Sequence, residues 1–219
     1  MDSIFNPIGI LFFLISIGIL IYSAILHEIA HGYVAERLGD PTARLLGRLT
    51  LNPIPHIDPF LSILLPLLLI FSHTGIIFGG AKPVPVDPYN LKEGRKDLAL
   101  VSLAGPAMNI LLVIIGTLFY KLLGGQSATG FLQFVVIFFE YVIRINLSLA
   151  IFNLLPIPPL DGSKIFALIL PENLANTYLS LSSFGTIILL VLLMFPVGGF
   201  SLMNVVSSIF AYSIQLLGL

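Results

Sequence analysis

The sequence predicts an all-α membrane protein, a polytopic bundle of about five to six transmembrane segments. Hydrophobic residues make up 57% of the 219 residues and charged residues 10%, and the mean hydropathy is +1.05. A soluble domain needs roughly a quarter charged residues to cover its surface. Several apolar runs are also long enough to cross a hydrocarbon core of about 30 Å as helices. We therefore expect an integral, multi-pass membrane protein with the lipid bilayer as a partner.

Charge and cysteine content exclude several kinds of function. The formal net charge is −1 without a basic tail, which argues against nucleic acid as a partner. The chain contains no cysteine, so a thiol nucleophile and a thiolate metal site are both excluded.

The first apolar run, residues 8–33, is long enough to span the membrane as a helix. This helix is expected to continue to Leu38, because Gly39 is a typical C-terminal capping residue and Pro41 cannot continue a helix. The run therefore predicts one long helix that ends in a polar connection.

The next region mixes polar and apolar segments. Short β segments are expected near 42–51, and an extended peptide substrate could pair with such an edge strand. Residues 60–78 are apolar but interrupted by Pro66 and by a polar break at 72–75, which favours a re-entrant element that enters and leaves on one face. A polar loop at 79–97 leads to the next apolar run.

Four further apolar runs complete the expected bundle, at residues 98–122, 131–155, 178–195 and 200–217. No loop is long enough to hold a separate soluble domain. We interpret 1–219 as a single membrane domain, with a core at 8–165 and accessory C-terminal helices at 178–217.

An HExxH motif, His27-Glu28-Ile29-Ala30-His31, lies near the end of the first apolar run. On a helix the two histidines are one turn apart and can bind one metal ion, and Glu28 can act as a base on a water molecule. An ionised carboxylate in the middle of a membrane helix costs about 2.5–3.5 kcal/mol on insertion scales. A bound Zn²⁺ is the simplest group that offsets this cost.

A second polar cluster supplies a third ligand for such an ion. Asp161 follows a helix end broken by prolines, and Gly162 leaves room beside it. A catalytic zinc usually has three protein ligands and an open position, so Asp161 is a good candidate. Asp161 is also a good N-cap residue for the helix that starts near Ser163, an alternative that ligation does not exclude.

Three motifs in this order resemble the site-2 protease family of intramembrane zinc metalloproteases. They are the HExxH motif, Gly105-Pro106-Ala107-Met108-Asn109, and the NxxPxPxxDG pattern from Asn153 to Gly162. Residues 51–59 and 81–86 resemble the small prokaryotic branch of that family, which lacks PDZ and CBS domains.

The resemblance implies one zinc ion per chain, held by His27, His31 and Asp161, with Glu28 as catalytic base. It implies that Asn153 helps to bind substrate or to stabilise the oxyanion. The expected reaction is hydrolysis of peptide bonds within or near transmembrane segments, by water that the zinc activates. The expected partners are a membrane-spanning protein substrate and a regulatory membrane protein or further copies of the chain.

If His27, His31 and Asp161 bind one metal ion, they must lie on the same side of the membrane, which limits the possible topologies. If residues 60–78 cross the membrane fully, Asp161 and the histidines end on opposite sides. A re-entrant element brings them together and also gathers the loop cations on one face, which the positive-inside tendency assigns to the cytosol. We therefore expect a prokaryotic cell membrane protein whose active-site side faces the cytosol.

Several alternatives remain open at this point. A metal or proton transporter could use the same His, Glu and Asp groups together with Glu140 as a relay, and an inactive membrane scaffold is a third reading. Asn153 could satisfy only backbone groups freed by the prolines. His56 and Asp58 are weaker candidates for substrate or metal contacts, and Asn109 for contact with a metal ligand.

Overall fold

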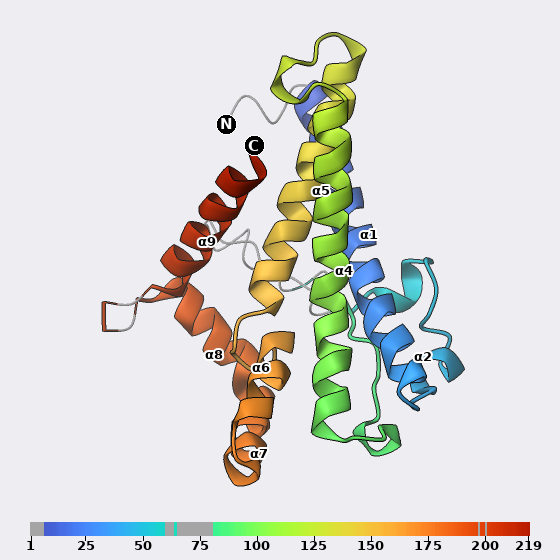
Figure 1. Ribbon diagram of the computed structural model, residues 1–219, viewed down its shortest axis with the longest axis vertical. Helices are drawn as coiled ribbons and strands as arrows, with labels where there is room; N and C mark the ends of the chain where they lie inside the picture. The colour runs from blue at the N-terminus through green and yellow to red at the C-terminus, as the bar shows by residue number, and fades with distance from the viewer. Residues whose placement is uncertain (1–6, 60–63, 65–80, 197, 200) are drawn as a thin grey trace.

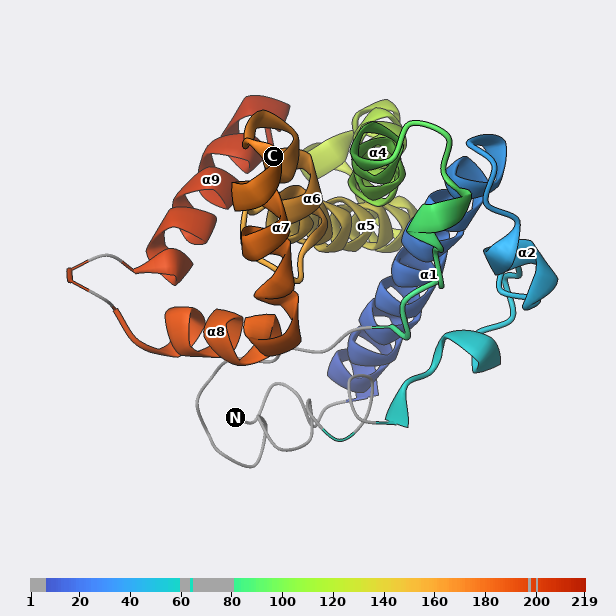
Figure 2. The same ribbon diagram turned by 90° about the horizontal axis from the view of Figure 1, so that it is seen from below.

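Three long helices form the centre of the molecule. The computed structural model describes residues 7–59, 64, 81–196, 198–199 and 201–219. Helices α1 (Pro7–Arg37), α4 (Arg95–Leu122) and α5 (Phe131–Asn153) pack side by side, and α4 contacts both of the others (Figures 1 and 2). Each is long and apolar enough to cross a membrane. The all-helical membrane fold is therefore confirmed for the described ranges.

The number of spans is lower than expected in the described residues. Helices α7 (Glu172–Ser180) and α8 (Ser182–Met194) form a pair bent by 67°, and α9 (Leu202–Leu217) is shorter than a span. Length and composition thus give three spans, or four if the bent pair counts as one, rather than five to six. The expected element at 60–78 lies outside the described residues, apart from Leu64.

The expected β segments at 42–51 are wrong. Residues Thr42–Leu45 form the short helix α2, followed by turns and by a 3₁₀ helix at Ile54–His56. Local hydrogen bonds decide this: the N–H of Leu46 donates to the carbonyl of Thr42 at 3.1 Å. A run this short satisfies its backbone within itself when no neighbouring strand is available. The expected edge strand for substrate is therefore absent from this segment.

The chain leaves α1 and enters α4 at the same end of the bundle. Ala35 of α1 packs against Leu91 and against Val101 of α4. Helix α4 then runs to the far end, and α5 returns from it, as Figure 1 shows. The non-helical residues 154–160 lead into α6 (Asp161–Phe166), which packs on α4. The HExxH end of α1 and the start of α6 are thus neighbours, as they must be if residues of both helices bind one metal ion.

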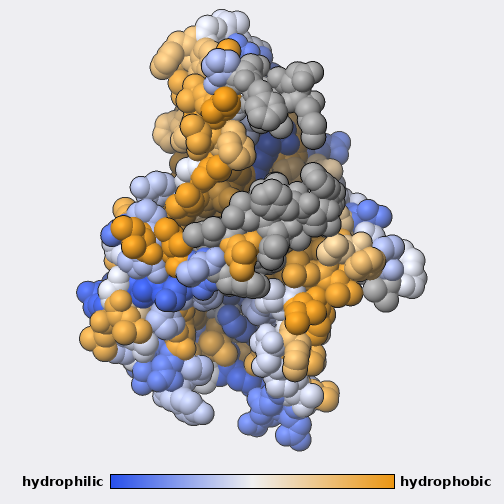
Figure 3. All heavy atoms as spheres, turned by 180° about the vertical axis from the view of Figure 1, so that it is seen from behind, coloured by the Kyte–Doolittle hydropathy of each residue, from blue (hydrophilic) through white to orange (hydrophobic). Residues whose placement is uncertain are grey.

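The outer surface matches a membrane environment. Large hydrophobic side chains are exposed along all three long helices. On the face seen in Figure 3, hydrophobic residues dominate the upper part and hydrophilic residues gather at the lower end. A surface of this composition would be unstable in water, and lipid tails would cover it.

Asp40 ties the chain after α1 to residues 81–90, which we call the strap. Its buried carboxylate accepts hydrogen bonds from the N–H of Asp87 at 2.8 Å and from Asn90 Nδ2 at 3.0 Å. Thr42 donates its N–H and its hydroxyl to the same carboxylate. Burial alone would raise the pKa of Asp40, but the hydrogen bonds from Thr42, Asn90 and Asp87 outweigh it and lower the pKa.

We expect Asp40→Ala to destabilise the protein by about 1–3 kcal/mol at neutral pH, because several buried donors lose their acceptor. Because the pKa of Asp40 is lowered in the folded state, its carboxylate stabilises the fold at pH values above the ordinary carboxyl pKa of about 3.9. This stabilisation is lost as the pH falls below that value. Thermal unfolding in detergent should therefore show a difference from wild type that is constant near neutrality and narrows below about pH 4. The exposed Glu93→Ala is the control and should change stability by no more than about 0.5 kcal/mol. A difference that stays constant into acid would contradict the role of the carboxylate.

Candidate metal centre

Three potential ligand atoms from distant parts of the sequence converge at one point. His27 and His31 lie one turn apart on α1, and Asp161 is the first residue of α6. The two Nε2 atoms are 3.0 Å apart, and Asp161 Oδ2 lies 3.2 Å from His27 Nε2 and 3.1 Å from His31 Nε2. All three residues are buried and form a group that could hold a metal ion. Among the described residues it is the group with metal-site geometry.

The hydrogen bonds behind the rings point both Nε2 lone pairs at this position. Nδ1 of His31 lies 2.6 Å from the carbonyl of Val101, and Nδ1 of His27 lies 2.6 Å from Asn109 Oδ1. Because both partners are acceptors, each Nδ1 carries the proton and each Nε2 is free to bind a metal. Two lone pairs and a carboxylate oxygen this close repel one another unless a cation lies between them.

The donor set fits zinc. Imidazole nitrogen and carboxylate oxygen bind Zn²⁺ at about 2.0–2.2 Å, usually in a tetrahedral arrangement. Such an ion separates its ligand atoms by roughly 3.3 Å, close to the spacing found here. Outer partners that hold each imidazole at Nδ1 are also typical of zinc sites.

Gly105 keeps the space beside the ligands open. A Cβ atom at this position of α4 would lie 2.5 Å from His27 Nε2 and would also collide with His31 Nε2. Real Cβ atoms essentially never approach other atoms so closely. Gly105 therefore permits α4 to pack closely against the candidate ligands.

Glu28 faces the same cavity. The cavity has a volume of about 460 Å³. Its lining includes the three candidate ligands, Glu28, apolar residues of the strap and of α4, and the polar side chains of Ser102, Asn153, Lys164 and Ser182. Oε2 of Glu28 accepts a hydrogen bond from the N–H of Val84 in the strap at 2.7 Å. The strap thus holds the carboxylate at the cavity wall. Sequence reasoning missed Val84, since a backbone N–H leaves no signature in side-chain patterns.

Both carboxylate oxygens of Asp161 have a partner nearby. Gly162 lets the start of α6 pack against the backbone at Leu154, because a Cβ there would collide with the carbonyl of Leu154. Lys164 Nζ lies 3.4 Å from Asp161 Oδ1, so this oxygen faces a cation while Oδ2 faces the histidines. The alternative that Asp161 caps the helix is wrong: Leu160 occupies the N-cap position, and α6 has no side-chain cap hydrogen bond.

Asn153 lines the cavity but turns part of its amide toward its own helix. Its Nδ2 donates to the carbonyl of Leu149 at 3.0 Å. The carbonyl of Leu149 lies inside α5 and is not one that Pro156 or Pro158 frees, so this bond favours neither interpretation of Asn153 and its role stays a prediction. The amide has a second N–H, which this bond leaves free for the cavity.

The weaker candidates differ in where they lie relative to the candidate metal site. Asn109 contacts His27, a candidate ligand, as expected. His56 is buried, and its Nε2 lies 3.0 Å from the carbonyl of Thr50. Asp58 is half-buried, and neither residue lines the cavity. Glu140 forms an ion pair with Arg144 at 2.8 Å and does not join the ligand group, so the transport relay gains no support.

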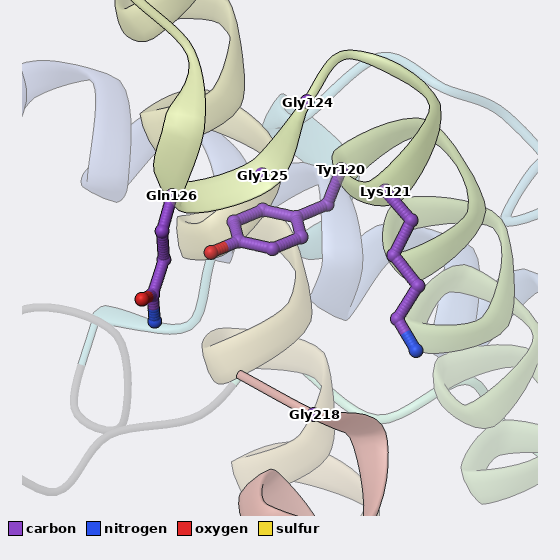
Figure 4. A pocket seen from close by; sticks show the side chains of 6 residues that line it. All are labelled: Tyr120, Lys121, Gly124, Gly125, Gln126 and Gly218. Atoms are coloured by element: carbon purple, nitrogen blue, oxygen red, sulfur yellow. The ribbon is translucent and has the colours of Figure 1, made fainter.

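A second cavity of about 330 Å³ lies at the opposite end of α4. Figure 4 shows its lining: Tyr120, Lys121, Gly124, Gly125, Gln126 and Gly218. These residues include no histidine and no carboxylate side chain. Its described lining therefore offers no group of metal-ligating side chains like the one beside Glu28.

Comparison with known proteins gives a consistent result. The family model described as Peptidase family M50 matches residues 120–196. "Putative zinc metalloprotease YwhC" of Bacillus subtilis is 41% identical over 186 residues, which cover 84% of this chain and 81% of that protein. "Putative zinc metalloprotease Rip2" of Mycolicibacterium smegmatis is 32% identical over 196 residues, which cover 84% of this chain and 68% of that protein. No solved structure matches the chain.

Proposed function

The chain belongs to peptidase family M50, the site-2 protease family, and is accordingly a zinc metalloprotease; we propose that it hydrolyses peptide bonds within or near transmembrane segments. One observation carries the proposal. The ligand group of His27, His31 and Asp161 lies beside Glu28 on a cavity at the end of an apolar, membrane-spanning helix. We further propose one zinc ion per chain, held by these three residues.

A zinc ion held there supplies a Lewis acid that polarises the scissile carbonyl and makes water a stronger acid. Glu28 accepts a proton from the attacking water and later returns it to the departing amine, so it acts as base and then as acid. The hydrogen bond from Val84 keeps this carboxylate facing the cavity during both transfers. The second N–H of Asn153 is available to the developing oxyanion.

The cavity also indicates the substrate class. Its walls include Val86, Leu98 and Leu160, which favour apolar side chains. A helical peptide hides its carbonyls in backbone hydrogen bonds, so the scissile segment must unwind before a carbonyl can enter. We propose that the substrate is a membrane-spanning protein whose apolar segment is locally extended in the cavity.

We propose that the active-site end faces the cytosol. The cations Arg37, Arg44, Lys92 and Arg95 lie at the end where α1 stops and α4 begins, whereas Lys121 lies at the far end of α4. The positive-inside tendency assigns the cation-rich end to the cytosolic side. YwhC and Rip2 come from bacteria, which supports a bacterial cell membrane.

We expect Asp161→Ala to lose zinc and to abolish cleavage, because two imidazoles alone leave the ion without its third ligand. Zinc content of the purified protein and fragments formed from membrane proteins in cells are the two measurements. Glu172→Ala, at an exposed position at the start of α7, is the control and should behave as wild type. Full zinc content in Asp161→Ala would refute the proposed ligand set.

A further inference from the structure

A chain of hydrogen-bonded side chains extends from His27 into the bundle and joins α1, α4 and α5. Beyond the His27 contact, Asn109 Nδ2 donates to Asn146 Oδ1 at 2.8 Å. Asn146 Nδ2 then donates to Ser23 Oγ at 2.9 Å and to the carbonyl of Val142 at 2.9 Å. Both asparagines are 0% exposed and Ser23 is 4% exposed. Burying an amide this deep in the bundle costs free energy unless its N–H and C=O groups form hydrogen bonds. Each of these asparagines therefore needs defined hydrogen-bond partners.

The hydrogen bonds in this row of side chains can run in one direction only, because the carbonyl of Val142 fixes the orientation of the first amide. A carbonyl can only accept, so the NH₂ group of Asn146 must face it. Oδ1 of Asn146 therefore faces Asn109 and can only accept from it. Asn109 must then present its own NH₂ to Asn146 and its Oδ1 to His27.

This direction decides which nitrogen of His27 carries the proton. Because Asn109 Oδ1 is an acceptor, His27 must carry its proton on Nδ1, and Nε2 keeps the lone pair that a metal needs. A flipped Asn109 would donate to Nδ1 and move the proton to Nε2. The flip would also set two acceptor oxygens against each other at the contact with Asn146. Asn146 thus opposes the flip without touching His27.

We propose that Asn146 is a positioning residue for the metal centre, which acts through Asn109 to hold His27 in its metal-binding tautomer. This inference rests on the proposed function, since it assumes that His27 Nε2 binds zinc. A different role is conceivable for buried amides in a membrane, namely joining helices by hydrogen bonds alone. The two roles differ in how substitutions at the two asparagines combine.

A double-mutant cycle tests the inference. Zinc affinity is measured for Asn109→Leu, Asn146→Leu and the double variant, each in a Glu28→Gln background so that no cleavage is involved. We expect Asn146→Leu to weaken zinc binding roughly 10–100-fold, as for other groups that hold a metal-binding histidine from outside. The double variant should bind zinc no more weakly than Asn109→Leu, because Asn146 acts through Asn109. Independent, multiplying losses or unchanged affinity in Asn146→Leu would overturn the inference.

A control variant and a measurement on the unsubstituted protein complete the test. Thr117→Val removes another buried polar group of α4, one that makes no hydrogen bond in the described part of the chain, and should leave zinc affinity unchanged. ¹⁵N NMR of zinc-loaded wild type should show the proton of His27 on Nδ1, a readout that needs no variant to fold. A proton on Nε2 would overturn the inference. Absence of zinc binding by wild type would refute the proposed function and the inference with it, whereas zinc binding with the proton of His27 on Nε2, or with affinity unchanged in Asn146→Leu, would refute the inference alone.

Discussion

Glu28→Gln should retain zinc but lose cleavage of a membrane-spanning substrate by about 10²–10⁴-fold, the usual contribution of a general acid–base group. Glutamine has nearly the same shape as glutamate, and its carbonyl oxygen can still accept the hydrogen bond from Val84. The substitution therefore removes proton transfer while the cavity and its lining remain. Neither His27 nor His31 loses its outer hydrogen bond, so the ligands should hold zinc as in wild type.

The measurement is cleavage of a purified transmembrane substrate in liposomes, together with zinc content of the same preparation. Glu36→Gln is a matched control, because Glu36 lies two turns further along α1, where it pairs with Arg44. The control should cleave as wild type does. Equal cleavage by Glu28→Gln would remove Glu28 from the mechanism, whereas loss of zinc would show that the variant disturbs the site itself.

The ligand geometry was predictable because local spacing determines most of it. Two histidines four residues apart on a helix face one point whatever surrounds them. Asp161 is 134 positions from His27, and its place came from the resemblance and from the requirement that the chain return to the histidine side. The long apolar runs were predictable for a similar reason, since membrane spans need only length and composition.

Other features depended on contacts that one sequence does not reveal. Ser23 and Asn146 look like isolated polar residues in apolar runs, and their hydrogen bond joins positions 123 residues apart. The segment at 42–51 alternates weakly in polarity, and such a short run does not distinguish a strand from a helical turn. There the local hydrogen bonds of α2 prevail.

Gly105→Ala should eliminate zinc binding and, with it, cleavage. Alanine favours a helix over glycine by about 1 kcal/mol, so α4 itself should be at least as stable as in wild type. The added methyl group, however, would lie 2.5 Å from His27 Nε2 and would collide with His31 Nε2. The rings can avoid it only by rotating, which breaks their hydrogen bonds to Asn109 and Val101.

We expect Gly105→Ala to lose more zinc affinity than the roughly 100-fold typical of substitutions that touch only the groups behind a ligand. The helix-favouring change offsets only part of the cost of the two broken hydrogen bonds, so the metal-free protein should unfold cooperatively at a temperature somewhat below that of wild type, and a retained cooperative transition separates a blocked site from a misfolded one. Gly18→Ala is the matched control, because a Cβ at Gly18 of α1 meets no atom within 4 Å. It makes the same helix-favouring change and should leave zinc affinity and cleavage intact. Normal zinc binding by Gly105→Ala would mean that the ion lies away from the two Nε2 atoms, and the ligand assignment would fail with it.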